Sequence, residues 1–391
     1  MPNFHTKTYN QPTLPTKFGE TQFQFVATSS RGEVLVMSKC SGEDFLLKVN
    51  KNKNGYLIKG DKITRPSQVA VLQRALMDFR DASNAEATLS NIESKKIKSL
   101  EISPYLKKMD YFADEFQTDK EILIEVGFGS GRHLLHQAKK HPDKLVIGLE
   151  IHKPSIEQVL KQCELQNITN ILAVDYDARV FLEFLDSNSV RSIFVHFPVP
   201  WDKKPHRRVI SERFINEAKR VLKVGGTLEL RTDSDNYFEY SFSEFVKQPK
   251  VELHVNKNKD LEISSKYEDR WKRQEKDIYD ITMVAHENSE NVAKIGRLKF
   301  SKNIDFSELK KRFEEKILRG DDFFAHIEEI YEIDDTSGFV RVSFGGAQKN
   351  EHNYIHITKE SISYLPDNVL ATKDNLNAHK LIEETLYGIC D

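Results

Sequence analysis

The chain has 391 residues, of which 30% are charged and 39% hydrophobic, and its formal net charge is −2. This composition is that of an ordinary globular protein, and the length predicts two or three domains. The near-zero charge argues against a general nucleic-acid binder, so any such binding must depend on local basic clusters. The residues after Met1 lack the layout of a signal peptide, and no run approaches about 18 consecutive apolar residues. We therefore expect a cytoplasmic protein without a membrane span.

The three cysteines support the same compartment. Cys40, Cys163 and Cys390 are isolated in the sequence and offer neither a metal-ligand spacing nor a disulfide framework. A reducing cytoplasm and the absence of a metal site are therefore expected.

Residues 1–110 are predicted to form a β-rich N-terminal domain of unknown role. Strands are expected at 22–28, 33–39, 45–50 and 56–59. Asn54–Gly55 is typical of a tight hairpin turn between the last two. A helix is expected at 67–80, because apolar residues recur there on one helical face. The polar residues 81–98 are predicted to be a linker.

Residues 111–288 are predicted to form the domain that carries the chemistry. Strands are expected at 121–126, 144–149, 170–174, 191–197, 226–232, 250–255 and 278–285. Their alternation with helical patterns predicts an α/β fold, with a mostly parallel seven-stranded sheet and helices on both faces.

Residues 289–391 are predicted to form an α+β C-terminal domain of unknown role. The expected order is a strand, a helix over Ser307–Arg319, strands near 338–344 and 353–358, and a C-terminal helix. We find no internal repeat and no low-complexity segment in the chain.

A glycine-rich loop is the strongest functional signal. A β-branched run ends at Glu125 and is followed by Gly127, Gly129 and Gly131, after which an amphipathic helix begins. Glycines at this place let the backbone turn tightly and approach a ligand closely. The strand and helix on either side are the context that a nucleotide-cofactor loop requires, so we predict cofactor binding here.

Acidic residues are predicted to complete the cofactor pocket at the carboxyl ends of the strands, where open α/β sheets bind ligands. Glu150 closes the second strand and is placed to accept both hydroxyls of an adenosine ribose. Asp177, after the third strand, could bind the adenine amino group, and Asp175 is an alternative for that role.

The glycine spacing discriminates between cofactors. A pyrophosphate cofactor would fit a G-x-G-x-x-G spacing, and here the third glycine comes too early. Glu125 in the same turn would also repel a pyrophosphate. A cofactor with a cationic centre, S-adenosylmethionine, suits such an acidic pocket better, so a methyltransferase is favoured over a dehydrogenase.

The loop after the fourth strand combines prolines, an aromatic residue and basic residues. Its prolines stiffen the chain, and Trp201 could stack on a base or pack in the core. Residues 201–208 hold four Lys or Arg against one Asp, a density that can engage phosphates locally.

These segments resemble the bacterial tRNA (guanine-N7)-methyltransferases. The matching segments are Glu125–Gly131, Gly148–Glu150, Phe197–Arg208, Thr232–Tyr237 and Ser265–Arg270. The resemblance implies a class I, Rossmann-like methyltransferase fold, S-adenosylmethionine as donor, and a guanine in the variable loop of tRNA as target.

The resemblance also implies roles for single residues. It implies cofactor contacts at Glu125, Glu150 and Asp177. It implies substrate contacts at Lys203, Asp233, Ser265 and Glu268, and we expect Asp233 and Glu268 to be catalytic by holding the guanine.

One departure from the family pattern concerns the catalytic site. The family has an Asp between the two prolines of the loop, where this chain has Val199. Asp202 lies three residues further on, too far to replace it without a large displacement. Two other classes therefore stay open: another Rossmann-like enzyme (a small-molecule methyltransferase or an NAD-dependent dehydrogenase), and an RNA-binding protein with impaired catalysis.

Overall fold

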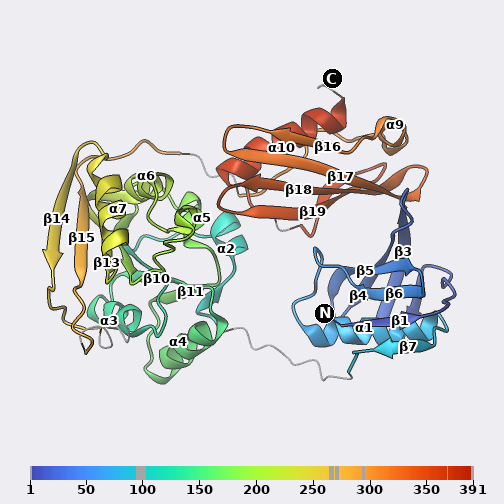
Figure 1. Cartoon of the computed structure of the whole chain (residues 1–391), viewed down its shortest axis with the longest axis horizontal. Helices are drawn as coiled ribbons and strands as arrows, with labels where there is room; N and C mark the ends of the chain where they lie inside the picture. The colour runs from blue at the N-terminus through green and yellow to red at the C-terminus, as the bar shows by residue number, and fades with distance from the viewer. Residues whose placement is uncertain are drawn as a thin grey trace. The chain divides into compact units, whose positions relative to one another are not determined.

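The computed structural model describes residues 2–93, 103–263, 268, 273–292, 296–367 and 369–388. Contacts between residues divide the chain into two compact units (Figure 1). Residues 101–296 form the central unit, and residues 1–100 together with 297–391 form the flanking unit. The sequence predicts separate domains for 1–110, 111–288 and 289–391, and independent folding of the two flanks stays a prediction.

The central unit contains a mixed eight-stranded sheet in the order β14-β15-β13-β12-β9-β10-β11-β8. Its strands are β8 (Leu106–Lys107), β9 (Ile122–Val126), β10 (Leu145–Leu149), β11 (Ile171–Val174), β12 (Val190–His196), β13 (Leu222–Thr232), β14 (Val251–Lys257) and β15 (Tyr279–Ala285). The seven predicted strands are all present. The predicted count is wrong, because the two-residue β8 has no apolar run to indicate it. The sheet is mixed because β15 runs antiparallel to both β13 and β14.

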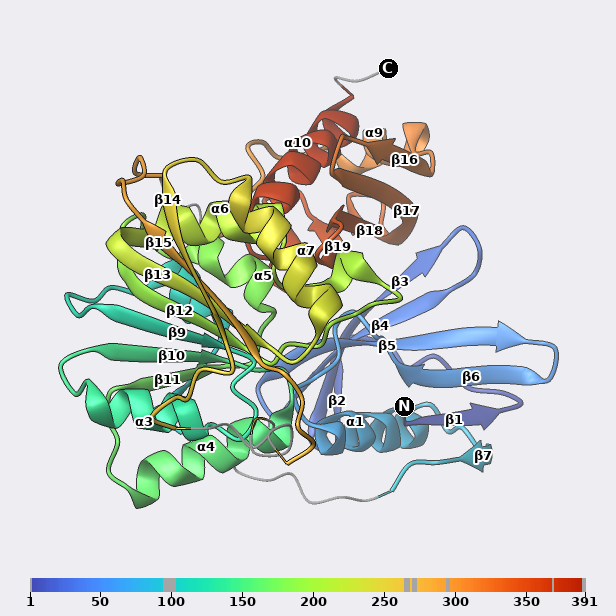
Figure 2. The same cartoon turned by 60° about the vertical axis from the view of Figure 1, so that its left-hand side comes forward.

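Helices cover both faces of this sheet (Figure 2). On one face lie α3 (Arg132–Lys140) and α4 (Lys153–Leu165), and on the other lie α6 (Glu212–Val221) and α7 (Asp235–Val246). Two short helices, α2 (Met109–Asp114) and α5 (Ala178–Phe181), complete the unit. Strand β9 pairs with β12, but the chain leaves β9 towards β10 and leaves β12 towards β13. The direction of winding therefore reverses between β9 and β12, and open α/β sheets bind ligands at the carboxyl ends of the strands beside such a point.

The N-terminal part of the flanking unit is β-rich, as predicted. It contains β1 (Asn3–Thr6), β2 (Thr16–Phe18), β3 (Thr21–Ser29), β4 (Val34–Cys40), β5 (Glu43–Asn52), β6 (Gly55–Gly60), α1 (Val69–Ala82) and β7 (Ala87–Ser90). The four predicted strands and the helix are confirmed. The predicted linker is wrong at β7, which pairs with β1 although its four residues are exposed and carry no buried face.

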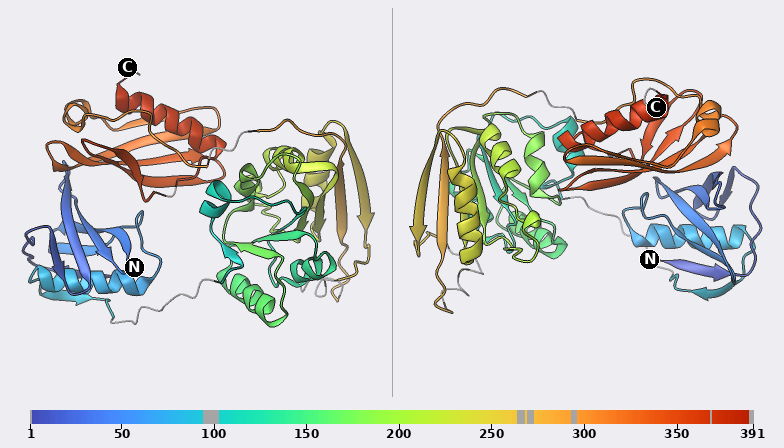
Figure 3. Two further views of the ribbon diagram at one scale, coloured as in Figure 1. Left: turned by 180° about the vertical axis from the view of Figure 1, so that it is seen from behind. Right: turned by 45° about the horizontal axis from the view of Figure 1, so that its top comes forward.

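The C-terminal part contains α9 (Phe306–Arg312), β16 (Lys316–Arg319), β17 (Phe323–Asp334), β18 (Ser337–Gly346), β19 (Asn350–Ile357), β20 (Ile362–Leu365) and α10 (Lys373–Tyr387). Helix α10 packs against β17 and β18 (Figure 3). The helix predicted to reach Arg319 is too long, because the chain turns after α9 and pairs β16 with β17. No strand begins at 289 in the described part of that segment.

Both chain ends share one sheet in the flanking unit, in the order β20-β19-β18-β17-β3-β4-β5-β6-β1-β7. The link is between β3 and β17, where Ser29 lies opposite Tyr331 and Thr28 opposite Glu332. A buried cluster also contains residues of both ends, Leu35 and Met37 beside Phe339 and Tyr354 among them. Among the described residues, no helix is long and apolar enough to cross a membrane.

Candidate active site

The glycine loop connects β9 to α3 with three left-handed residues. Gly127, Gly129 and Gly131 have φ angles of 69°, 51° and 71°. A Cβ on Gly131 would overlap the side chain of Val159 on α4, so this glycine lets the loop pack closely. A Cβ on Gly127 would meet nothing within 4 Å. The backbone at Gly127 therefore borders open space, which suits the close approach of a cofactor.

Glu150 lies beside this loop, at the end of β10. Its Oε2 accepts a hydrogen bond from the amide of Gly129 at 2.9 Å. Its Oε1 accepts from the amides of Ile151 and His152 at 2.8 and 2.9 Å. These bonds hold the carboxylate at the strand end predicted for it, next to the glycine loop.

Glu125 is buried beneath the loop and is bound by a histidine of α3. The distance from His133 Nδ1 to Glu125 Oε2 is 2.9 Å, and Gln137 contacts the other ring nitrogen at 3.0 Å. Burial opposes the charged form of His133, but the hydrogen bond to Glu125 together with the negative charges of Glu125 and Glu229 raises the pKa of His133. The pair fixes the orientation of Glu125 near the carboxyl end of β9.

A second histidine–carboxylate pair adjoins the first. The rings of His133 and His196 lie 4.6 Å apart, and His196 Nε2 is 2.7 Å from Glu229 Oε1. Burial opposes ionisation of Glu229, yet the hydrogen bond from His196 together with the positive charges of His196, His133 and Arg231 lowers the pKa of Glu229. The contact of the two rings thus links the two histidine–carboxylate pairs, which come from β9, α3, β12 and β13.

Asp177 lies at the start of α5 and already has a cationic partner. Its carboxylate caps the amide of Arg179 and forms an ion pair with the guanidinium of that residue at 2.6 Å. Asp175, the alternative adenine ligand, is exposed directly after β11. The structure therefore places both candidates at the predicted strand end, and only Asp177 is engaged by a neighbouring cation among the described residues.

The loop 197–208 is anchored by its last residue. Arg208 is only 7% exposed, and its Nε donates to the carbonyl of Pro200 at 2.7 Å. It also pairs with Asp202 at 3.2 Å. The ion pair between Asp202 and Arg208 therefore links two residues of the same loop. Phe197 and Trp201 have positive φ angles of 50° and 47°, so this anchored loop holds two strained residues.

The tip of this loop presents apolar and basic groups to solvent. Val199 is 59% and Trp201 37% exposed, and the guanidinium of Arg207 lies 5.1 Å from the Trp201 ring. Lys203 is exposed as well. Of the two possibilities for Trp201, the surface position is the one found.

The loop rests on the turn that follows β13. The amide of Ile210 donates to the hydroxyl of Tyr237 at 3.0 Å, and Arg208 lies over the rings of Tyr237 and Tyr240 at 5.2 and 4.6 Å. Two segments that are far apart in the sequence, Phe197–Arg208 and Thr232–Tyr237, are therefore one physical assembly. The sequence analysis gave Tyr237 no role of its own.

The predicted catalytic residues have different surroundings. Asp233 follows β13, remains 20% exposed at its side chain, and pairs with Lys276 at 3.0 Å. Glu268 is 1% exposed and pairs with the fully buried Arg231 at 2.9 Å. Arg231 also pairs with Asp280 at 2.5 Å. Of these two predicted catalytic residues, only Asp233 therefore presents a carboxylate at the surface. Ser265, a predicted substrate contact, lies outside the described residues.

Some residues of this site could not be assigned from the sequence. His133 and Arg231 hold predicted residues in place, but neither stands in a pattern that indicates this. His133 follows Glu125 by eight positions, across the glycine loop, and that spacing alone does not indicate a contact. Arg231 meets Glu268 only through folding, because the two lie 37 positions apart in the sequence, so no local pattern indicates the contact.

Comparison with known proteins identifies the family. A family model described as "Putative methyltransferase" matches residues 119–281. A tRNA (guanine-N(7)-)-methyltransferase of Wolinella succinogenes is 41% identical over 99% of this chain and 100% of its own length. The chain belongs to the tRNA (guanine-N7)-methyltransferase family. A second member, from Campylobacter jejuni, is 40% identical over 99% of this chain and 98% of its own.

These tRNA (guanine-N7)-methyltransferases match both units of the chain, since the shared length includes the flanks as well as the central unit. A solved structure of an antibiotic-related methyltransferase covers 48% of this chain and 97% of its own, with a TM-score of 0.34 and 19% identity. Membership of the family makes the chain an S-adenosylmethionine-dependent methyltransferase.

Proposed function

We propose that this enzyme methylates N7 of a guanine in the variable loop of tRNA, and that the guanine binds in a crevice between the glycine loop and the loop 197–208. The observation that carries the proposal is the position of these two loops on either side of the point where the sheet winding reverses. One loop borders open space beside a fixed carboxylate, and the other exposes an aromatic ring and basic side chains. We assign the central unit the class I methyltransferase fold.

The reaction makes modest chemical demands on the protein. Guanine N7 carries an in-plane lone pair and no proton, so no general base is required. Bound S-adenosylmethionine supplies a methyl group on a positively charged sulfur. A C–N bond forms as the C–S bond breaks, sulfur keeps the electron pair, and the purine gains positive charge. The protein must hold N7 in line at about 3 to 3.5 Å and stabilise that charge.

The cofactor residues that we propose line the ends of three neighbouring strands. Gly127, Gly129 and Gly131 give the close backbone approach, and Glu150 accepts from the ribose hydroxyls. Glu125, oriented by His133, places negative charge near the sulfonium. We assign Asp177 to binding the adenine amino group. Its carboxylate pairs with Arg179, so adenine must bind beside this ion pair or displace Arg179 from it.

The substrate residues that we propose lie on the opposite side of the crevice. Trp201 stacks on a base, backed by Arg207, and Lys203 binds a phosphate or a base edge. Asp233, which pairs with Lys276, stabilises the positive charge that develops on the methylated guanine. We also propose that the hydroxyl of Ser265 contacts the substrate, as the resemblance to the family implies.

Glu268 takes a different part in this proposal from the one expected. Its carboxylate is buried against Arg231, so we assign it to positioning the end of β13, immediately before Asp233. In this arrangement the loss of the family Asp at Val199 is tolerable, because Asp233 supplies the electrostatic stabilisation.

The test is mass spectrometry of nucleosides from unmodified tRNA treated with purified protein and S-adenosylmethionine. We expect 7-methylguanosine from the wild type and almost none from Asp233→Ala, with the affinity for S-adenosylmethionine nearly unchanged. The matched control is Asp235→Ala, an exposed acid two positions further on at the start of α7. No 7-methylguanosine from the wild type would reject the function, and full activity of Asp233→Ala would reject the assignment of that residue.

A further inference from the structure

The flanking unit contains a pocket of about 590 Å³ formed by both chain ends. Residues on and just after β5 and β6 line one side, and residues of β18 and β19 line the other. Its volume falls in the range of about 300 to 1,000 Å³ typical of ligand pockets. Nothing in the proposed methyl transfer uses this pocket.

Four permanent cations line the pocket: Lys48, Lys59, Lys62 and Arg341. The lining contains two carboxylates, and each is engaged elsewhere. Asp61 accepts from the Tyr354 hydroxyl at 3.1 Å and from two backbone amides, and Glu351 pairs with Lys349 at 2.8 Å. Among the described contacts, neither carboxylate of the lining forms an ion pair with a cation of the lining.

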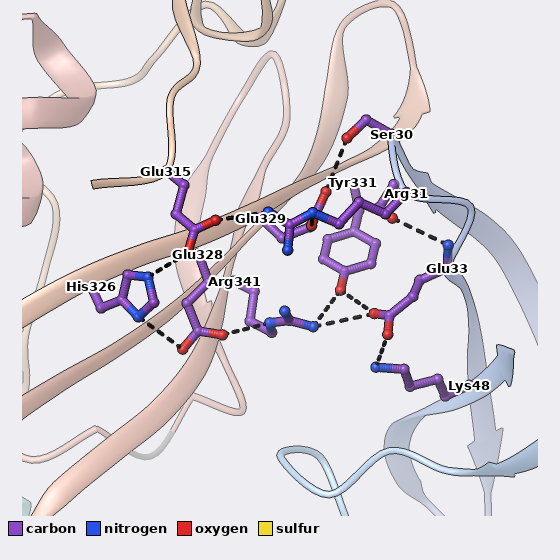
Figure 4. A network of polar contacts seen from close by, with 11 residues as sticks. Ser30, Arg31, Glu33, Lys48, Glu315, His326, Glu328, Glu329, Tyr331 and Arg341 are labelled. Atoms are coloured by element: carbon purple, nitrogen blue, oxygen red, sulfur yellow. Dashed lines mark hydrogen bonds and ion pairs between the residues drawn. The ribbon is translucent and has the colours of Figure 1, made fainter. Parts of the chain in front are cut away.

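Two of the cations are fixed by a network of polar contacts (Figure 4). Glu33 pairs with Lys48 at 2.5 Å and with Arg341 at 3.2 Å, and it accepts from the Tyr331 hydroxyl at 2.6 Å. Arg341 is held further by Glu328 at 2.7 Å. This network joins the two chain ends and sets the positions of Lys48 and Arg341 at the pocket wall.

The other two cations have no such partner. In the described part of the chain, no carboxylate lies within ion-pair distance of Lys59 or Lys62. Lys59 also stands directly opposite Lys48 on the neighbouring antiparallel strand. Like charges in that register are destabilising, and an anion between them removes the repulsion. Lys59 is partly buried, which increases the need for a counter-charge.

We propose that this pocket binds a phosphate of the tRNA backbone. The inference rests on the proposed function, and it gives the flanking unit a part in substrate binding. Lysines serve as point-charge ligands of phosphate, and Arg341 still has one terminal nitrogen that no described contact occupies. Relatives named as tRNA enzymes contain this unit over its whole length, so tRNA is the phosphate source that we favour over a free nucleotide.

The test compares two double variants of the full chain. Lys59→Gln with Lys62→Gln removes the two unpaired pocket cations. Lys51→Gln with Lys53→Gln removes two exposed cations from the adjacent β5–β6 hairpin and is the matched control. The affinity for tRNA is measured by filter binding across a range of salt concentrations, and that for S-adenosylmethionine by calorimetry.

We expect the pocket variant to bind tRNA about tenfold more weakly at about 0.1 M salt and to lose about 1 to 2 units of the slope of log K against log salt. The control should change by less than twofold, and the affinity for S-adenosylmethionine should be unchanged. Lys59→Arg with Lys62→Arg keeps the charges and should restore binding, which separates charge loss from misfolding.

Equal losses in the pocket and control variants would overturn the proposal, as would wild-type affinity in the pocket variant. A third arm titrates ATP and inorganic phosphate. Saturable ATP binding that the pocket variant abolishes, with tRNA affinity intact, would assign the site to a free nucleotide and overturn it too. A wild type that makes no 7-methylguanosine would instead reject the proposed function, and the tRNA affinities would still be measurable.

Discussion

Arg208 is the residue whose replacement tests most directly how the loop 197–208 is held. Its guanidinium donates to the Pro200 carbonyl, pairs with Asp202 and lies over Tyr237 and Tyr240. A buried charged hydrogen bond is worth about 1.5 to 3 kcal/mol, and each ring contact adds about 0.5 to 1. The pair with the half-exposed Asp202 adds at most about 1 kcal/mol. These terms are not additive, so we take about 2 to 4 kcal/mol for the anchoring.

Arg208→Lys keeps the charge and removes the planar fork that makes these contacts together. A loss of about 2 kcal/mol in loop ordering corresponds to about a 30-fold fall in kcat/KM for tRNA. The affinity for S-adenosylmethionine should stay within about twofold, because the glycine loop does not touch Arg208. Methyl incorporation into tRNA and calorimetry measure the two quantities.

The control for this experiment is Arg213→Lys on α6, whose guanidinium pairs with Glu183 outside the loop. It should leave kcat/KM for tRNA nearly unchanged. Wild-type kcat/KM in Arg208→Lys would refute the reasoning, since it would mean that the loop is ordered without these contacts. Equal losses in both variants would indicate a general effect on stability instead.

Three further outcomes are expected. Glu268→Ala should lower the free energy of unfolding by about 3 to 5 kcal/mol in denaturant, because it removes a partner from the buried Arg231; a loss below about 1 kcal/mol would contradict that role. Val199→Asp should leave the methylation rate unchanged or raise it, since the side chain is exposed, and a collapse of the rate would show that the valine itself is needed. NMR should find the pKa of His133 above about 6.5. Burial lowers the pKa of His133, but the hydrogen bond and the negative charge of Glu125 raise it by more. Because the folded-state pKa is raised, the pair stabilises the fold fully below the unfolded pKa, and this stabilisation is lost as the pH rises through the folded pKa. A measured pKa of His133 below about 6.5 would contradict the pair.

The sequence was sufficient for elements that local patterns define. The β-branched run before Gly127, the alternation of strands and helices to residue 285 and the Asn54–Gly55 turn all have local causes, and all predicted strands of these regions are present. The helix over Ser307–Arg319 was too long, because Leu309, Phe313 and Ile317 keep helical spacing by chance into a strand. Strand β17 was missed altogether.

Contacts between segments that are distant in the sequence could not be predicted from local patterns. The pairing of Arg231 with Glu268 and the support of Arg208 by Tyr237 depend on how strands and loops meet after folding. The union of the two flanks is the largest such case, since β3 and β17 are separated by the whole central unit. The cofactor loop could be located because its residues are consecutive. The environment of Glu268 could not be predicted, because its partner Arg231 lies on β13, far from Glu268 in the sequence.

The joining of β3 to β17 has a consequence for synthesis on the ribosome. The nascent chain makes β3 to β6 first and must then complete the central unit before β17 to β19 emerge to cover the apolar residues of the shared cluster. A premature stop after residue 296 leaves the methyltransferase unit intact but the earlier strands uncovered. Exposed apolar surface and open strand edges attract chaperones and proteases. We therefore expect a chain truncated after residue 296 to be more prone to aggregation and proteolysis than the full chain.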